Sequence, residues 1–533
     1  MRPAFTHPVL LGLLIIAACS GNGQERDAAE IETCTPLSPP VYPERFRPQF
    51  HFTPAANWSN DPNGLVYYRA EYHLFYQHEP DVPFFWLMHW GHAVSRDLIH
   101  WEHLPVALSP DETLGQPYSG SAVVDHHNRS QLCGHSSPDD DSCLIAIFTH
   151  HGGKDGKEKQ SLAFSNDQGR TLQPYPENPV LPNQGQKDFR DPKVFWHDPT
   201  GHWIMVLAAG DRVHLYGSDN LITWVYLSDF SPAHTISGVL ECPDLFELPI
   251  EGRPDERHWI LKVDGNPGPL CPGSGSYYFV GEFDGAQFTT MQTEPRRVDY
   301  GADFYASQSW SDVPDGRRIW IAWMSNWQYA LFVPTQPWRG AMSLPRQLSL
   351  ARLGDDITLL QRPAPELEAL RHCRLLSLSE EVVNGESPLL DSVSGDALEV
   401  VARIELEDAS RVGLRVREGM GMVTEIVYDV DQERLYLDRS RSGAFFSERF
   451  SGLQAAPLSV PDRVLELQIF VDWSSLEVFA EGGRAVMTDL IFPDPESRGL
   501  GLFAQGGPAK LLSLEVYTLA SIWSASPPHR SSP

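Results

Sequence analysis

The chain has 533 residues and a formal net charge of −29, from 41 Lys and Arg residues against 70 Asp and Glu residues, with no run rich in Lys or Arg. Nucleic acid is therefore not expected as a partner, because such a surface repels phosphates, and a neutral ligand fits better. Hydrophobic residues make up 41% and aromatic residues 11% of the chain, which indicates a globular protein with a sizeable core and roughly two to four domains.

The first 19 residues have the pattern of a bacterial lipoprotein signal peptide. A short apolar run follows Met1-Arg2 and ends in Ile16-Ala17-Ala18-Cys19, which resembles a lipobox. The run is too short to span a bilayer comfortably, so we expect cleavage before Cys19 and lipidation of that residue, with a plain secretory signal as the alternative. Residues 20–45 are predicted to be a tether. The protein is thus expected to be exported to the outer membrane, cell surface or periplasm, with membrane contact through the lipid anchor alone.

Export also allows disulfides to form. Cys133 and Cys143 flank the polar loop CGHSSPDDDSC and are the predicted pair. No C-x-x-C spacing suggests zinc or thioredoxin-like chemistry.

Between residues 46 and 358 the chain consists of short β-type runs, such as GLVYYRAEYHLFYQH and RRIWIAWMSN, separated by Gly, Pro, Asn and Asp turns. Many short strands at regular spacing predict an all-β sandwich, barrel or propeller. The segments SRDLIHW, SNDQGRTL and SDNLITW repeat one pattern. Repetition of this kind favours a propeller, in which each small sheet buries its faces against its neighbours.

A second unit is predicted after LLQRPAPELEALR, with residues 359–375 as a linker. Residues 376–523 contain alternating runs such as LEVVARIEL and LELQIFVDWSSLEVFAEGG. Alternation of polar and apolar residues with a period of two predicts an antiparallel β-sandwich. The tail, residues 524–533, is predicted to be disordered.

Three segments place acidic residues at turns or strand ends: WSNDPNG with Asp61, FRDPKVF with Arg190 and Asp191, and LECPDLFEL with Glu241. Each has a structural interpretation when taken alone. Pro62-Asn63-Gly64 is expected to form a turn after Asp61, and an Arg-Asp-Pro sequence is commonly a local salt bridge.

Taken together, in this order and at this separation, the three segments resemble glycoside hydrolase family 32, the β-fructosidases that include invertases, inulinases and levanases. The resemblance extends from about residue 50 to residue 523 through YHLFYQ, MHWGHAVSRDLIHWEHLPVAL, GADFYASQSW, PTQPWRGAMSLPRQL and LEVFAEGGRAVMTDLIFP. It implies an all-β fold in which a five-bladed β-propeller, with the active site in its central funnel, is followed by a C-terminal antiparallel β-sandwich. It implies no cofactor.

The resemblance also implies the catalytic residues. Asp61 corresponds to the nucleophile, Glu241 to the general acid/base and Asp191 to a transition-state stabiliser that holds fructosyl hydroxyls. A retaining glycosidase needs one carboxylate to attack the anomeric carbon and one carboxylic acid to protonate the leaving oxygen, with the two groups about 5 Å apart. The remaining residues that the resemblance assigns to substrate binding are Asn60, Gln77, Trp86, Ser119, Arg190 and Trp338. Trp86 is the weakest of these transfers, because the usual Trp lies one residue further from WGHA.

A metal site is the competing interpretation of HWGHAVSRDLIHWEH, which contains His89, His92, His100 and His103. On a strand, the H-x-x-H spacing puts the two histidines of a pair on opposite faces, so they cannot bind one ion together easily. No metal site is therefore expected.

The leading functional hypothesis is an exo-acting fructan β-fructosidase that releases terminal β-D-fructosyl units from levan or inulin, and also hydrolyses sucrose. The alternative enzymatic function is that of an invertase or a fructosyltransferase, which would use the same covalent intermediate. A surface glycan-binding lipoprotein with an inactive site is the alternative from another class. The choice between β-2,6 and β-2,1 linkages depends on the shape of the funnel beyond the first sugar, and it stays open, as does exo versus endo action.

Overall fold

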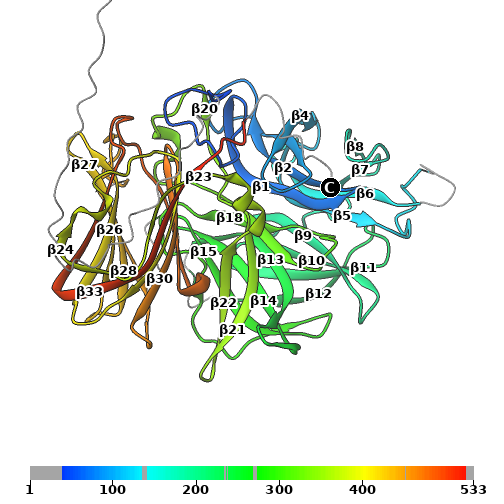
Figure 1. The fold of residues 1–533 in the computed structure, drawn as a ribbon. Coiled ribbons are helices and arrows are strands. Elements are labelled where there is room, and N and C mark those ends of the chain that lie inside the picture. Colours follow the sequence, from blue (N-terminus) through cyan, green and yellow to red (C-terminus); the bar gives the residue numbers. More distant parts are fainter. Residues whose placement is uncertain are drawn as a thin grey trace, which may run out of the picture.

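The computed structural model describes residues 39–134, 141–232, 236, 238–267, 273–450 and 452–523. The expected signal peptide with Cys19, most of the expected tether and the predicted tail lie outside the described residues. Two all-β units lie side by side (Figure 1). Within the described ranges, no helix has the length and apolar character needed to cross a bilayer.

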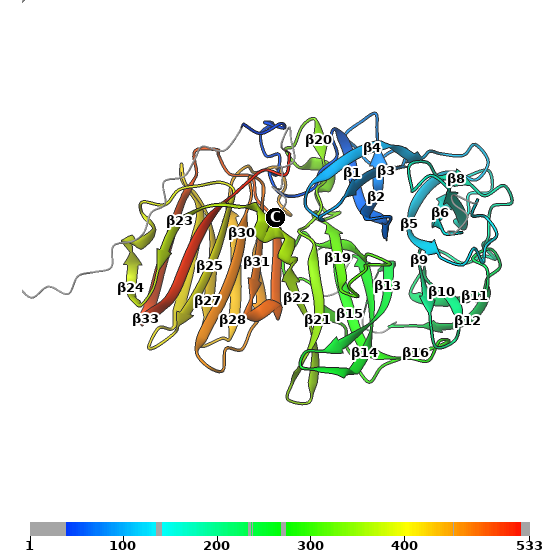
Figure 2. The same ribbon diagram turned by 45° about the vertical axis from the view of Figure 1, so that its right-hand side comes forward.

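The first unit is a β-propeller whose antiparallel blades follow one another around a ring (Figure 2). The first three blades are β1 (Asn57–Tyr68), β2 (Glu71–Glu79), β3 (His89–Ser95) and β4 (Trp101–Leu108); β5 (Gln116–Asp125), β6 (Cys143–His151), β7 (Lys159–Ser165) and β8 (Gln173–Pro174); and β9 (Phe189–His197), β10 (His202–Ala209), β11 (Arg212–Ser218) and β12 (Val225–Phe230).

The last two blades are joined by a parallel contact between β13 and β21. The fourth consists of β13 (Val239–Ile250), β14 (Arg253–Asn266) and β15 (Gly275–Phe283), with the short strands β16 (Phe288–Thr289) and β17 (Arg296–Arg297). The fifth consists of β18 (Tyr305–Ser309), β19 (Arg318–Trp323), β21 (Arg346–Leu353) and β22 (Asp356–Pro363). The ring closes where the backbone of Ser311 exchanges hydrogen bonds with Leu65 and Tyr67, and where β20 (Trp338–Arg339) runs parallel to β1.

The three repeated segments occupy equivalent places in the first three blades. Ser95, Ser165 and Ser218 end β3, β7 and β11. Each hydroxyl hydrogen-bonds the acidic or amide side chain two residues later, at 3.1, 2.7 and 3.3 Å. The same local turn thus leads from the third strand of each blade towards the fourth. The prediction of a propeller is confirmed.

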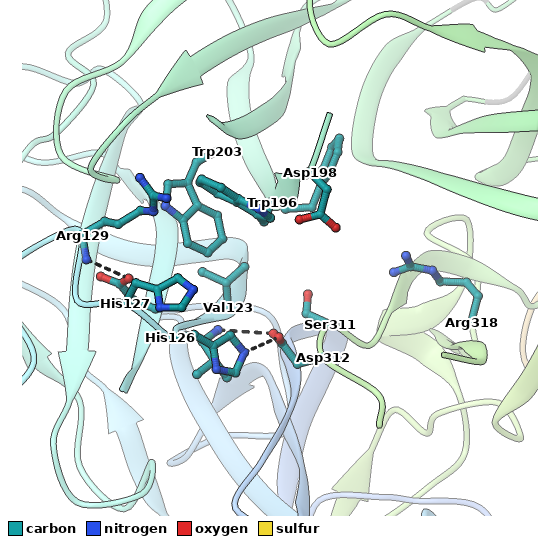
Figure 3. Close-up of a pocket in the computed structure, with 13 residues that line it drawn as sticks. Val123, His126, His127, Arg129, Trp196, Asp198, Trp203, Ser311, Asp312 and Arg318 are labelled. Atoms are coloured by element: carbon teal, nitrogen blue, oxygen red, sulfur yellow. Dashed lines mark hydrogen bonds and ion pairs between the residues drawn. The ribbon is translucent and has the colours of Figure 1, made fainter. Parts of the chain in front are cut away.

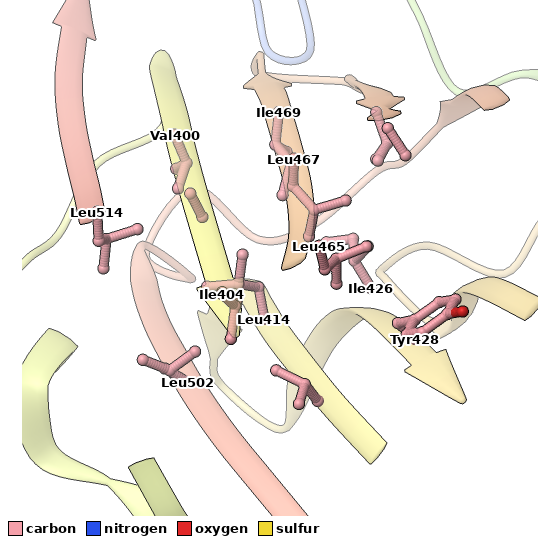
Figure 4. Packing of buried hydrophobic residues seen from close by; sticks show 14 of the residues in the cluster. Val400, Ile404, Leu414, Ile426, Tyr428, Leu465, Leu467, Ile469, Leu502 and Leu514 are labelled. Atoms are coloured by element: carbon pink, nitrogen blue, oxygen red, sulfur yellow. The ribbon is translucent and has the colours of Figure 1, made fainter. Parts of the chain in front are cut away.

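The second unit is the predicted β-sandwich. Its strands are β23 (Arg371–Leu378), β24 (Glu381–Ser387), β25 (Leu398–Glu405), β26 (Arg411–Gly419), β27 (Met422–Asp429), β28 (Arg434–Arg441), β29 (Leu453–Pro457), β30 (Val464–Val471), β31 (Ser475–Ala480), β32 (Ala485–Leu490) and β33 (Gly499–Leu519). The long strand β33 pairs with β23, β24, β25 and β26. Alternate apolar residues such as Val400, Leu414, Leu467 and Leu502 point into one buried core (Figure 4).

The segment expected as a linker is mostly ordered strand. β22 continues the fifth blade to Pro363, and β23 already belongs to the sandwich at Arg371. The 3₁₀ helix η2 (Pro365–Leu370) separates them and buries Leu367 and Leu370. Pro365 at its first position suits a helix start, because that position needs no backbone donor.

Buried ion pairs join the two units. Arg346 of β21 donates to Asp299 at 2.9 Å and to Glu477 of β31 at 2.6 Å. His51, from the segment before the propeller, lies between Asp472 and Glu477. Because an unpaired buried charge is costly, removing one partner of such a network destabilises the junction.

The predicted disulfide is present. Cys133 and Cys143 are bonded, with their Cα atoms 5.2 Å apart. The bond ties the middle of the β5–β6 connection to the start of β6, and it confirms the pairing expected from the polar loop between the two residues.

Candidate active site

The expected catalytic residues converge because the inner strands of the blades all begin at one end of the propeller axis. Asp61, Ser119, Asp191, Glu241 and Tyr305 lie at or near the starts of β1, β5, β9, β13 and β18. Together they border one cavity. Its lining consists of Asn60, Asp61, Gln77, Phe85, Tyr118, Ser119, Arg190, Asp191, Glu241, Tyr305 and Trp327.

Asp61 lies in a bulged strand and not in the expected turn. The pairing of β1 with β2 shifts register between Ser59 and Pro62 and again between Asn63 and Val66. Pro and Gly interrupt a regular ladder, and such bulges re-aim a side chain next to an active site. The turn-forming residues therefore kink a continuous strand. The bulge turns the Asp61 carboxylate towards the cavity.

Three side chains contact the Asp61 carboxylate. Asn60 Nδ2 donates to Oδ1 at 3.0 Å, Ser119 Oγ donates to Oδ2 at 2.7 Å, and Cys242 Sγ lies 3.5 Å from Oδ2. Trp58 Nε1 donates to Asn60 Oδ1 at 2.7 Å and fixes the orientation of that side-chain amide. These contacts fix the orientation of the Asp61 carboxylate at the cavity.

Asp191 is held in a conformation that favours glycine. Its φ is 66°, and its backbone N–H donates to Thr149 Oγ1 at 3.0 Å. The backbone N–H of Cys242 donates to Asp191 Oδ2, also at 3.0 Å. Burial raises the pKa of the Asp191 carboxyl above its ordinary value, Arg190 opposes the rise, and the charges of Glu241 and Asp61 add to it. Strain and a shifted pKa at one residue are typical of functional sites.

Glu241 is bound from both sides of its carboxylate. Arg190 donates to Oε1 from Nη2 at 2.9 Å and from Nε at 3.3 Å, and the Tyr305 hydroxyl donates to Oε2. The pairing of β13 with β14 shifts register after Glu241, and Cys242 has a φ of 46°. Here too a bulge presents the acidic side chain.

Two expected sugar contacts lie elsewhere. Trp86 is 77% exposed, and its neighbour Phe85 lines the cavity instead. Trp338 is buried, with the guanidinium of Arg47 4.9 Å from its ring centroid. Asn60, Gln77, Ser119 and Arg190 do line the cavity. The one-residue offset of Trp86 in the sequence agrees with its place outside the cavity.

Several residues at the site, Phe85 among them, were not singled out from the sequence. Tyr305 and Trp327 line the cavity, and Cys242 contacts two of the carboxylates. Cys242 follows Glu241 directly in LECPDLFEL, and Tyr305 lies in GADFYASQSW. Both motifs carried the family resemblance, so the signal was present although no side chain was assigned.

The histidines of the competing metal hypothesis have separate surroundings. His92 lies 3.1 Å from His73, His100 binds Asp97, and His103 stacks on Trp523. In the part of the chain that the structure describes, no group of three or more His, Cys, Asp or Glu side chains is arranged to hold a metal ion.

Three carboxyl groups meet at this cavity: Asp61 is held by donors, Glu241 lies between Arg190 and Tyr305, and Asp191 is buried beside them. A pair of carboxyl groups flanking the scissile bond is the usual machinery of a glycosidase. The chain belongs to glycoside hydrolase family 32. Residues 51–363 match the model of the glycosyl hydrolases family 32 N-terminal domain, and residues 366–518 match that of the family 32 C-terminal domain. The two matches cover the propeller and the sandwich, and the predicted family is confirmed.

Individual relatives agree with this assignment. The chain is 48% identical to a levanase of Bacillus subtilis (strain 168) over 497 residues, covering 91% of this chain and 72% of the levanase. It is 34% identical to an extracellular exo-inulinase of Aspergillus awamori, covering 90% and 96% of the two chains. The crystal structure of the exo-inulinase from that organism superposes with a TM-score of 0.84 over 90% of this chain and all of the other.

Proposed function

We propose that this glycosidase releases terminal β-D-fructosyl units from fructans, levan or inulin, and from sucrose, with retention of configuration. The observation that carries the proposal is the gathering of Asp61, Asp191 and Glu241 around one cavity at the starts of the inner strands. The similarity to a levanase and to an exo-inulinase supports fructans as the substrate class.

In the proposed mechanism the Asp61 carboxylate attacks C2 of the terminal fructosyl unit while Glu241 donates its proton to the leaving oxygen. The developing positive charge is stabilised by Asp191, whose carboxylate also accepts hydrogen bonds from fructosyl hydroxyls. Water, deprotonated by Glu241, then hydrolyses the fructosyl ester on Asp61. Arg190 and Tyr305 hold Glu241 in place for both steps.

The cavity supports exo action. Its lining comes from all five blades and includes the aromatic rings of Phe85, Tyr118 and Trp327. A pocket closed at its base accepts a chain end, whereas endo cleavage needs a groove open at both ends. Aromatic rings pack against the C–H faces of a sugar while the polar groups bind its hydroxyls.

Product analysis tests the proposal. Levan, inulin and sucrose are incubated separately with the protein, and the products are resolved by chain length. Release of free fructose from the first minutes supports exo hydrolysis. Oligofructosides formed from sucrose with little free fructose would indicate a fructosyltransferase, and intermediate-length fragments from levan would indicate endo action.

Two variants separate the enzyme from an inactive glycan-binding protein. Asp61→Asn and Glu241→Gln are both expected to stop fructose release from sucrose, since each removes one catalytic step. A fructoside with an acidic phenol as leaving group needs no proton donor, so it should restore cleavage in Glu241→Gln but not in Asp61→Asn. Unchanged fructose release by both variants would contradict the assigned mechanism.

We further propose export and lipidation at Cys19. The Aspergillus relative is described as extracellular, and Ile16-Ala17-Ala18-Cys19 has the lipobox pattern. Metabolic labelling of the full chain with a radioactive fatty acid is expected to mark the parent and to leave Cys19→Ser unmarked. Equal labelling of both would contradict the anchor.

A further inference from the structure

A second cavity lies at the end of the propeller axis opposite the active site and has a volume of about 580 Å³. Its lining includes Val123 and Asp125 at the end of β5 and Phe195 near the end of β9. The starts of the same two strands carry Ser119 and Asp191. At the usual rise of about 3.3 Å per residue of a strand, these separations of four to six residues put the two cavities roughly 13–20 Å apart along the axis.

Buried side chains close the channel between the two cavities. Lys193 lies two residues after Asp191 on β9. Its Nζ donates to the carbonyl oxygen of Ser309 at 2.5 Å and lies 3.5 Å from Asp244 Oδ2. Lys193 is 2% exposed and Asp244 is fully buried. A ligand in the second cavity therefore enters from its own mouth and has no route to the catalytic carboxylates through the propeller.

Two indole rings form one wall of the second cavity. Trp196 and Trp203 meet edge to face, with centroids 5.2 Å apart and planes at 70°. The guanidinium of Arg129 lies 4.5 Å from the centroid of Trp196. Trp196 is partly exposed while Trp203 is buried behind it. An indole face held rigidly at a cavity wall is suited to packing against the C–H face of a sugar ring.

Charged groups face these indoles across the cavity. In the close-up, Arg318 lies across from the rings with Asp198 between them, and Asp312 lies beside His126 (Figure 3). Arg318 Nη1 donates to Ser309 Oγ at 3.3 Å and to the Trp310 carbonyl at 3.4 Å, and within the described residues its guanidinium forms no ion pair.

Asp312 is fixed by its neighbours. It accepts hydrogen bonds from His126 Nε2 at 2.9 Å and from the backbone N–H of Val124 at 3.3 Å. The cavity thus combines a fixed carboxylate, an aromatic wall and a guanidinium that pairs with no carboxylate among the described residues. Carboxylates and guanidinium groups bind vicinal hydroxyls, which are the polar groups of a sugar.

We propose that this cavity is a second, non-catalytic binding site for a neutral saccharide unit. The lining has two arginines, Arg129 and Arg318, against three carboxylates, Asp125, Asp198 and Asp312. With the histidines neutral, two positive against three negative charges leave a formal charge of −1, which offers no net attraction to an anion. The saccharide comes either from a segment of a polysaccharide chain or from a free monosaccharide. Which sugar the active site cleaves does not affect this inference.

Fluorine NMR on the full chain tests the site directly. The protein carries Glu241→Gln, to prevent turnover, and 5-fluorotryptophan at all Trp positions. The resonance of Trp196 is identified by its loss in Trp196→Phe, and that of Trp473, a partly exposed Trp of the sandwich, by its loss in Trp473→Phe. D-Fructose, sucrose, levan oligosaccharides and inorganic phosphate are added in separate titrations.

A saturable shift of the Trp196 resonance with a saccharide, and none of the Trp473 resonance, is the expected result. A response to the oligosaccharides at much lower concentration than to D-fructose assigns the site to a polymer segment, and an equal response assigns it to the monosaccharide. No shift with any saccharide, or a shift with phosphate alone, would overturn the proposal. Catalysis is assayed separately in the parent. The NMR titration can therefore be interpreted even if the proposed enzymatic function fails its own test.

Two substitutions check that the carboxylate takes part. Asp312→Asn removes a charged acceptor from the cavity, and it should raise the saccharide concentration at half-shift by about tenfold. Asp211→Asn, at an exposed position outside the lining, is the matched control and should leave the half-shift concentration unchanged. Equal half-shift concentrations for the two variants would contradict the assignment of Asp312 to the site.

Discussion

Arg190 donates two hydrogen bonds to Glu241 Oε1, from Nη2 at 2.9 Å and from Nε at 3.3 Å. Its remaining Nη1 donates to Glu158 at 3.1 Å and to Asp188 at 3.0 Å. One guanidinium therefore holds the proposed general acid/base and two further carboxylates in a fixed arrangement. The planar fork of Arg allows this, whereas the single ammonium of Lys cannot reach three partners in the same geometry.

Arg190→Lys and Arg190→Gln test this arrangement. Both should lower kcat/KM for sucrose, by about 10- to 100-fold, because each removes charged hydrogen bonds to Glu241. Arg212→Gln is the matched control, since Arg212 pairs with Asp211 and Asp229 on the surface. Steady-state kinetics provides the measurement, and parent-like activity of Arg190→Lys would show that the fork geometry is unimportant.

Cys242 lies between the carboxylates of Asp61 and Asp191. Its Sγ lies 3.5 Å from Asp61 Oδ2 and 3.6 Å from Asp191 Oδ2. Burial raises the pKa of the thiol well above its usual range, and the charges of Asp191 and Asp61 add to the effect. The group therefore stays protonated, and its S–H is a weak donor to one of the two carboxylates.

Replacing this thiol is expected to slow the reaction without unfolding the protein. Cys242→Ala removes the donor and should lower kcat by about tenfold, the cost of one hydrogen bond to a charged group. Cys242→Ser restores an O–H donor of similar size and should recover part of the loss. The readouts are kcat on sucrose and the midpoint of thermal unfolding, and equal kcat values for the parent and Cys242→Ala would refute a positioning role.

The sequence allowed the three carboxylates to be found but not the whole wall of the cavity. Asp61, Asp191 and Glu241 each lie in a short motif near the start of an inner strand. A propeller brings the starts of its inner strands together, so their meeting can be predicted from the fold alone, without knowledge of side-chain packing. Tyr305 and Trp327 reach the same cavity from the fifth blade. That meeting depends on ring closure between residues far apart in the chain, which no local pattern encodes.

The local conformation of a strand or loop, and the direction in which its side chains point, were the least predictable features. The NDPNG segment has ideal turn residues, yet it forms bulges in β1 because its neighbours pair with β2 on both sides. Trp86 and Phe85 differ by one position, and the packing of the loop decides which ring faces the cavity. A shift of one residue in an extended segment exchanges inward and outward side chains.

The contrast between Trp338 and Phe85 gives a further prediction. Trp338 packs with Phe46, Tyr329 and Ala341 in a buried cluster, so Trp338→Ala should lower the free energy of unfolding by about 3–5 kcal/mol. Phe85→Ala should instead raise the KM for sucrose, because it removes an aromatic wall of the cavity. Denaturant unfolding and steady-state kinetics on both variants separate the effects, and a raised KM with unchanged stability for Trp338→Ala would restore that residue as a sugar contact.

His51 joins the segment before the propeller to the sandwich. Its Nδ1 lies 2.8 Å from Asp472 Oδ2, its Nε2 lies 3.1 Å from Glu477 Oε1, and the imidazole is buried. Burial lowers the pKa of the imidazole, but the hydrogen bonds and charges of Asp472 and Glu477 outweigh it and raise the pKa of His51 to about 9. The folded protein thus holds a proton that the unfolded chain releases near pH 6.5.

This proton should make the free energy of unfolding depend on pH at alkaline pH. Because the pKa is raised on folding, the stabilisation by protonated His51 is complete below pH 6.5 and is lost as the pH rises through 9. The parent should lose about 3 kcal/mol of unfolding free energy over this interval from His51. His51→Gln should be less stable than the parent at pH 6 and should lack this part of the slope, while His202→Gln, which removes an exposed His–Asp pair, should keep it. Denaturant unfolding at intervals between pH 6 and pH 9.5 measures the slopes, and parallel curves for the parent and His51→Gln would show that the buried pair carries no proton.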